Sequence, residues 1–425
     1  MSFVSTKKNL ITTGSQSYLV PLILVTSLFF LWAFVHNLEP ILIPHLKKAC
    51  QLSDLQSALI DSSVYIGYLL MALPAGLFMK KFGYKKGILI GLLLYAFGAL
   101  LFIPAASTRV YIFFLGALFI IASGCAFLET AANPYVTILG KPETATTRLN
   151  FSQSFNGLGA FFAPILGGQL ILSGIEHSKS ELAAMSPLQL DHYLQMEADA
   201  VKIPYLIIAL VVLSVAAMIY FTSMPEVAID EKNKKTSVFK ALKHSQLKWG
   251  VVAQFFYVGA QVGVTSFFIR FAKYTSNTPE KDAAFWLGIA MFGFMVGRFG
   301  GTFLTRFIAP SKLLTIYAFT CVILLTLATF VKSEVAMWAL LVVPFFESVM
   351  FPTIFSLAIK DIREDTEIGS SLVVMAIAGG AVFPLMMGFI SDRSNIQLAY
   401  AVPLICFFVI AWFGMQGYRL QKTEY

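Results

Sequence analysis

The chain has 425 residues, of which 57% are hydrophobic and 13% are charged, whereas a soluble domain carries roughly 25% charged residues. A soluble fold of this size cannot bury so much apolar surface, so the composition excludes a soluble protein and predicts one that is largely surrounded by lipid. The net charge of +8 does not indicate a nucleic-acid partner, because Lys and Arg are spread over short segments between apolar runs, the pattern that sets membrane topology.

A membrane-spanning helix needs about 20 predominantly apolar residues, and the sequence contains twelve such runs, which predicts an all-α membrane protein. The predicted spans are 19–46, 56–79, 87–106, 110–139, 149–173, 203–223, 249–272, 284–306, 312–331, 335–359, 368–390 and 398–418. The first run is expected to stay as a helix, because no small-residue cleavage site follows it. A charged segment separates six helices from six, which predicts an N-terminal half at 1–223, a cytoplasmic linker at 224–248 and a C-terminal half at 249–425.

The distribution of basic residues predicts the orientation. With the N-terminus in the cytoplasm, roughly two-thirds of the Lys and Arg residues fall on the cytoplasmic side, as the positive-inside rule requires. Both termini are then cytoplasmic. The longest segment on the outer side, 174–202, has a weak amphipathic pattern and is either a lid or a surface decoration.

The two halves share local patterns. Glu129 precedes Pro134 by five residues, and Glu347 precedes Pro352 by the same spacing. A second pair of similar segments, 76–82 and 301–307, is offset by nearly the same number of residues. Two matching offsets indicate a duplicated six-helix unit, and parallel repeats of this kind are typical of secondary transporters, whose binding site lies between the repeats.

Four carboxylates interrupt the apolar runs: Glu39, Asp61, Glu129 and Glu347. An Asp at the centre of a membrane helix costs roughly 2.5–3.5 kcal/mol on insertion scales, so such residues usually serve a function and face the interior of the bundle. A carboxylic acid in a low-dielectric surrounding can exchange a proton near neutral pH, which a proton-coupled carrier requires. The alternative is a structural ion pair with Arg298 or Arg270, or a carboxyl that is hydrogen-bonded within the core.

Polar side chains cluster near two of these carboxylates. Asn133 lies one turn after Glu129, so both project from the same face of the helix, and Pro134 frees a backbone carbonyl beside them. In the first span, His36, Asn37 and Glu39 precede Pro40. We interpret this segment as a helix kink that opens on a polar cavity, although a short outer loop would also explain it.

Two further helices carry polar stripes. Gln153 and Asn156 share one face of the fifth span, while Gln254, Tyr257 and Gln261 follow one another at steps of three and four in the seventh. Amides both donate and accept hydrogen bonds, which suits the paired hydroxyls of a sugar. The alternative is polar contact between packed helices.

Enzyme signatures are absent from the sequence. It contains no Walker loop, no G-x-S-x-G elbow and no H-E-x-x-H motif, so transport is expected to be driven by a gradient or to be passive. The four cysteines lie far apart without a C-x-x-C pair, so we expect neither a metal site nor a disulfide framework.

The sequence resembles the major facilitator superfamily and, within it, the fucose permease family. The stretches that carry the resemblance are LETAANPYVTILG (128–140), RLNFSQSFNGLGA (148–160), AQFFYVGAQ (253–261), MVGRFGGTFL (295–304), FPTIFSLAIK (351–360) and GSSLVVMAIAGG (369–380). The resemblance implies two six-helix halves, alternating access, and symport of L-fucose with a proton as the only coupling ion and no other cofactor. It also implies a monomer in the bacterial inner membrane.

By the same resemblance, Glu129 would be the central carboxylate, coupled to both proton and sugar, and Asn37, Gln153 and Asn156 would line the sugar site. The chain departs from the family pattern twice. Lys80 replaces the Asp of the loop motif after the second helix, and Pro40 replaces the Asp of the first helix, where the acid is Glu39. One residue rotates a helical position by about 100°, so Glu39 would serve only if the kink turns it inward, and Asp61 is the other candidate.

Three alternatives remain open at this point. The substrate would be glucose, galactose or N-acetylglucosamine in related carriers of the same family. Transport would be coupled to sodium or uncoupled. A protein of a different class, a membrane sensor that binds a sugar without moving it, would share the fold and the binding residues but would show no flux.

Overall fold

The computed structural model describes residues 18–140, 145–174, 177–225, 241–305, 307–360, 362 and 366–418. Its N-terminal half contains α1 (Leu19–His36), α2 (Glu39–Ala49), α3 (Asp54–Ser57), α4 (Leu59–Phe82), α5 (Tyr84–Thr108), α6 (Tyr111–Ile138), α7 (Ala145–Leu170), α8 (Lys179–Ala184), α9 (Pro187–Asp199) and α10 (Lys202–Phe221). Most of the predicted linker, residues 226–240, lies outside the described residues, as do the two chain ends and Lys7 and Lys8.

The C-terminal half repeats the arrangement of long helices. It contains α12 (Ser245–Ser266), α13 (Phe268–Ser276), α14 (Glu280–Leu304), α15 (Pro310–Phe330), α16 (Glu334–Glu347), α17 (Met350–Ala358), α18 (Thr366–Met375), η3 (Ala376–Ala378), α19 (Gly379–Arg393), α20 (Ile396–Ala399), α21 (Ala401–Trp412) and η4 (Phe413–Gly417). The described residues contain no strand, which agrees with the predicted all-α fold.

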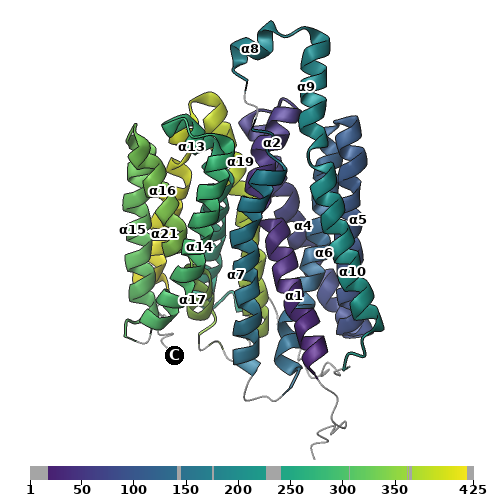
Figure 1. Cartoon of the computed structure of the whole chain (residues 1–425). Helices are drawn as coiled ribbons and strands as arrows, with labels where there is room; N and C mark the ends of the chain where they lie inside the picture. The colour runs from purple at the N-terminus through teal and green to yellow at the C-terminus, as the bar shows by residue number, and fades with distance from the viewer. Residues whose placement is uncertain are drawn as a thin grey trace, which may run out of the picture.

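Ten helical segments in the described chain are long and apolar enough to cross a membrane by length and hydropathy alone. An eleventh span is the pair α12 and α13, which is bent by 52°. The twelfth predicted span, 149–173, corresponds to α7, a helix of 26 residues. The hydropathy test does not include α7, since polar side chains such as Gln153 and Asn156 lower its mean hydropathy. Figure 1 shows α7 beside α1 along the length of the bundle.

The two halves stand side by side with their long helices roughly parallel (Figure 1). The helix α7 packs against both α1 and α14, so it lies where the halves meet. The end of the bundle with α2, α8 and α9 is called the loop face below, and the opposite end, with the start of α1, is called the terminal face. Large apolar side chains such as Leu73, Phe221 and Phe330 are exposed on the model, as expected for a surface that contacts lipid.

The predicted outer segment 174–202 forms two short helices on the loop face. Each begins with a capping box, in which Ser178 pairs with Glu181 and Ser186 pairs with Gln189. The helix α9 packs against α2 and α5 of the N-terminal half. An ion pair of 2.7 Å between Arg109 and the carboxylate of Asp191 anchors it there.

Candidate functional site

Three membrane helices are interrupted at the middle of the bundle. The helix α1 ends at His36 and α2 begins at Glu39; α12 ends at Ser266 and α13 begins at Phe268; α16 ends at Glu347 and α17 begins at Met350. Backbone groups freed at such breaks need partners inside a membrane. At the first break the carbonyl of Ala33 accepts from both the backbone N–H and the side-chain amide of Asn37.

The three breaks border one cavity of about 190 Å³. This volume is below the roughly 300–1,000 Å³ of sites for drug-sized ligands, so the cavity suits a small solute. Its polar lining comes from both halves and consists of His36, Asn37, Glu39, Tyr65, Asn156, Gln261, Thr265, Ser266, Arg298 and Glu347. Met291 and Phe294 add apolar surface, as a sugar ring with both C–H and hydroxyl faces would require.

The break in the first helix places Glu39 against this cavity. Its Oε1 lies 3.0 Å from Nδ1 of His36, and the other ring nitrogen of His36 lies 2.8 Å from the hydroxyl of Tyr65. Glu39 is 5% exposed, so the His36 ring shields most of an otherwise unpaired acid. The helix kink therefore turns Glu39 toward the cavity despite its one-residue shift relative to Pro40.

Glu129 lies in a second polar group within the N-terminal half. The hydroxyl of Tyr68 donates to its Oε1 over 2.8 Å. The amide of Asn133 donates to the backbone carbonyl of Glu129, and Gln153 donates to the side-chain oxygen of Asn133 over 3.0 Å. These contacts join α6 to α7 beside the cavity. The lining includes His36, whose ring meets the edge of Tyr68 at 6.1 Å, but not Glu129 itself.

Asp61 connects the two halves. It is fully buried on α4, and its Oδ1 accepts a hydrogen bond of 2.8 Å from the hydroxyl of Ser266 at the end of α12. Ser62 donates to the backbone carbonyl of Ala381 over 2.7 Å, again across the interface. Asp61 therefore lies behind Ser266 rather than in the cavity lining.

The polar stripe of the seventh span divides in the structure. Gln261 lines the cavity, whereas Gln254 and Tyr257 are fully buried and are not part of the lining. The Tyr257 hydroxyl donates to the backbone carbonyl of Glu347 over 2.9 Å, so it supports the break between α16 and α17. Gln254 and Tyr257, which the sequence predicts to bind the substrate, therefore lie outside the lining of this cavity. Helical spacing predicts that Gln254, Tyr257 and Gln261 lie on one side of the helix, but it does not predict which neighbouring helix packs against that side.

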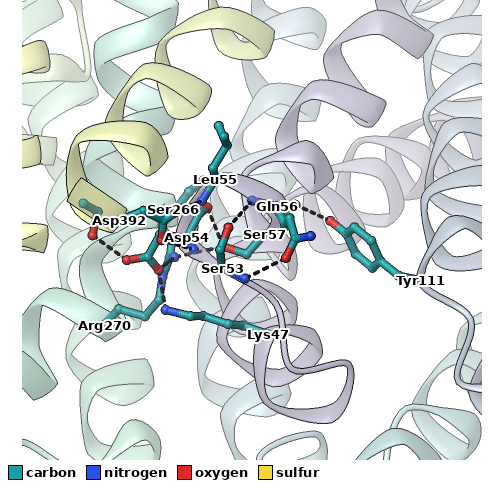
Figure 2. Close-up of polar contacts among 11 residues, drawn as sticks. Lys47, Ser53, Asp54, Leu55, Gln56, Ser57, Tyr111, Ser266, Arg270 and Asp392 are labelled. Carbon is teal, nitrogen blue, oxygen red and sulfur yellow. Dashed lines mark hydrogen bonds and ion pairs between the residues drawn. The ribbon is translucent and has the colours of Figure 1, made fainter.

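A cluster on the loop face, shown in Figure 2, joins the halves a second time. Asp54 accepts hydrogen bonds of 2.5 Å from both Arg270 and Lys47, and a further one from Ser391. Asp392 accepts from the backbone N–H groups of Asp54 and Leu55 at 2.7 and 2.8 Å. We call Asp54, Arg270, Lys47, Ser391 and Asp392 the loop-face latch.

A second inter-half ion pair lies beside the latch. Lys48 of α2 lies 3.1 Å from Glu280 of α14. Because these contacts join the halves on the loop-face side of the cavity, the structure is closed at the loop face. In the described part of the chain, no group of three His, Cys, Asp or Glu residues could hold a metal ion.

Comparison with known proteins now identifies the fold. A sequence model of the Major Facilitator Superfamily matches residues 23–367. The chain belongs to this superfamily. Its relatives include the L-fucose-proton symporter of Escherichia coli strain K12, which is 43% identical over 411 residues, or 94% of this chain and 93% of that protein. The glucose/galactose transporter of Brucella abortus strain 2308 is 42% identical over 96% of both chains.

Solved structures agree with this placement in the superfamily. A crystal structure of the Escherichia coli fucose:proton symporter is 42% identical, covers 95% of this chain and 99% of its own, and superposes with a TM-score of 0.69. A bacterial homologue of the human lysosomal transporter Spinster superposes with a TM-score of 0.77 at 16% identity, which shows the shared fold. The predicted family and fold are therefore confirmed, and the chain is a superfamily transporter rather than an enzyme.

Sequence reasoning missed most of the loop-face latch. Arg270 was considered only as a counter-ion for an intramembrane acid, whereas its partner is Asp54, 216 residues earlier. A local signal was present, since Ser53 precedes Asp54 as a helix cap and pairs with Gln56 in a capping box. That signal locates a helix start but says nothing of the other half.

Proposed function

We propose that the protein carries a monosaccharide across a bacterial inner membrane together with a proton, by alternating access. The observation that carries this proposal is one small cavity, at three helix breaks, in which Asn37, Asn156 and Gln261 lie beside the acid–imidazole pair Glu39 and His36. Amide side chains can bind neighbouring hydroxyls as donor and acceptor together. A buried acid beside an imidazole can bind and release a proton as its surroundings change.

We propose L-fucose as the substrate, in line with the Escherichia coli relative. Glucose and galactose are the second candidates, because a relative of nearly equal identity is a glucose/galactose transporter. The cavity lining mixes polar groups with Met291 and Phe294, which suits a 6-deoxy sugar with one apolar corner. Gln153 and Asn133 support the site from behind through their mutual hydrogen bond.

In the proposed cycle, Glu129 and the pair Glu39–His36 together take one proton, and the sugar binds between the halves. The halves then rock so that the loop face closes, which is the state described here, and the cargo leaves through the terminal face. We place the terminal face in the cytoplasm, because the basic segments of the sequence gather there. Each step depends on a difference in affinity between the two states. We propose that a monomer performs the cycle.

Proteoliposomes of the purified protein test the proposal directly. L-fucose, galactose, glucose and N-acetylglucosamine are added in turn, without an imposed gradient, while external pH and uptake of labelled sugar are followed. Alkalinisation with L-fucose alone supports the full proposal, and alkalinisation with another sugar corrects the substrate. Labelled uptake without a pH change overturns proton coupling, and binding without any uptake indicates a sensor.

A matched variant separates coupling from binding. Glu129→Gln keeps the shape and a hydrogen-bonding side chain for Tyr68 but cannot release a proton. We expect sugar counterflow to persist and uphill uptake driven by a pH gradient to fail. Unchanged uphill uptake in this variant would remove Glu129 from the coupling mechanism. Repeating the assay in sodium-free buffer excludes or reveals a sodium-coupled carrier.

A further inference from the structure

Glu347 differs from the other three intramembrane carboxylates. Glu39 contacts His36, Asp61 accepts from Ser266 and Glu129 accepts from Tyr68. Glu347 is fully buried and lines the cavity, yet neither of its carboxyl oxygens has a hydrogen-bond partner in the described structure. Buried polar atoms are normally paired, so an unpaired acid beside a cavity is a candidate for contact with a molecule bound there.

The nearest cationic side chain in the cavity lining is engaged elsewhere. The Nε of Arg298 donates to the backbone carbonyl of Ser348 over 3.3 Å, and its guanidinium lies 4.9 Å from the centre of the Phe294 ring. No ion pair to Glu347 occurs among the described residues. An unpaired carboxylate ion in a low-dielectric interior is strongly unfavourable, so Glu347 holds a proton in this state.

The local fold keeps this carboxyl free. Tyr257 donates to the backbone carbonyl of Glu347 and Arg298 to that of Ser348, so both carbonyls freed by the helix break are satisfied without the acid. Gly297 allows α14 to approach, because a Cβ there would lie 2.4 Å from the carbonyl oxygen of Phe345. The break is therefore held by backbone contacts while the side chain of Glu347 faces the cavity.

The internal repeat explains why the partner is missing. Glu347 corresponds to Glu129 in the duplicated pattern, with a similar offset relating the second helix to the eighth. The residue 225 positions after Tyr68, the partner of Glu129, is Gly293, which has no hydroxyl. A neutral carboxyl offers one O–H donor and a carbonyl acceptor. In Glu347 both are unpaired and shielded from water in this state, beside a cavity that could hold a sugar with adjacent hydroxyls.

We propose that Glu347 is a second proton-binding group of the transport cycle, located in the C-terminal half, and that its neutral carboxyl binds a sugar hydroxyl. This inference rests on the proposed sugar–proton symport. The titratable and charged groups near Glu347 are Arg298 on α14, Tyr257 on α12, Cys321 on α15 and Tyr400 between α20 and α21, with His36 and Glu39 also lining the cavity.

The number of protons moved per sugar tests the proposal. In proteoliposomes at zero membrane potential, each coupled proton multiplies the limiting sugar accumulation by about tenfold per pH unit of gradient. We expect about 100-fold accumulation for the wild type and about tenfold for Glu347→Gln at one pH unit. The exposed acid at the start of the same helix supplies the matched control, so Glu334→Gln should retain about 100-fold accumulation.

Counterflow exchange of labelled sugar shows that each variant is folded and binds substrate. If Glu347→Gln does not fold, the smaller neutral variant Glu347→Ser is used and the same tenfold limit is expected. Accumulation in the neutral variant that equals the wild type overturns the second proton site. A wild type that moves sugar without any proton instead overturns the proposed symport, so the two failures are distinguishable.

Discussion

Removing one charge from the loop-face latch should open the loop face of the transporter. The Asp54 and Arg270 side chains are 11% and 9% exposed, so their ion pair is largely shielded from water. Hydrogen bonds to charged groups contribute about 1.5–3 kcal/mol each. The contact to Arg270 exists only when the halves meet, whereas Lys47 belongs to the same half as Asp54. We therefore expect Asp54→Asn to weaken closure by about 2 kcal/mol, or roughly 30-fold in the closed-to-open ratio.

Distances between spin labels measure this shift. One label is placed at Leu188→Cys on α9 and the other at Ser394→Cys after α19, because both positions are exposed and lie in different halves. Cys50, the one cysteine that is not fully buried in the structure, is replaced by Ser. Asp54→Asn should move the distance distribution toward longer values. The matched control is Asp191→Asn, which removes an exposed ion pair within one half. An unchanged distribution in Asp54→Asn, or an equal change in the control, would refute the reasoning.

Three smaller perturbations follow from the same structure. His36→Gln removes the imidazole that lies 3.0 Å from Glu39 and should reduce uphill sugar uptake about tenfold. Tyr65→Phe keeps that contact and should reduce uptake less. Equal effects of the two variants would contradict a role for the His36–Glu39 pair. Gly124→Val places a Cβ 2.5 Å from a backbone carbonyl oxygen of α5 and should lower the free energy of unfolding by about 1–3 kcal/mol, measured by thermal melting in detergent. Gly116→Val, where the added Cβ meets open space, is the control. Asp392→Asn removes an anion from the N-terminus of α3, so it should weaken closure by about 0.3–1 kcal/mol. The spin-label distances should therefore shift less than in Asp54→Asn.

The sequence predicted the helix order well because each span is a long apolar run, and it located the helix break at 35–40 because polar residues beside a proline are unfavourable against lipid. It failed where a contact depends on the packing of distant segments. Tyr257 shares a helical face with Gln261, yet only Gln261 reaches the cavity, because α16 breaks beside Tyr257 and offers it a carbonyl. Periodicity defines a face of one helix, whereas the neighbour of that face is set by the fold.

The contacts of the latch and the Lys48–Glu280 pair could not be predicted from the sequence, for a second reason. Lys48 and Glu280 are separated by 232 residues and lie in different halves, so their pairing depends on how the two halves meet. Contacts that form and break during a transport cycle leave no local pattern, since the surrounding residues must suit both states.

The short helix α2 connects the cavity to the latch. Its first residue, Glu39, faces the cavity, and its last turn carries Lys47 and Lys48, which pair with the latch and with Glu280. Eleven residues of helix span about 16 Å, and Pro44 removes one backbone hydrogen bond near the middle of the helix. Because this one helix contacts both the cavity and the latch, we expect occupancy of the cavity and closure of the loop face to be coupled through α2.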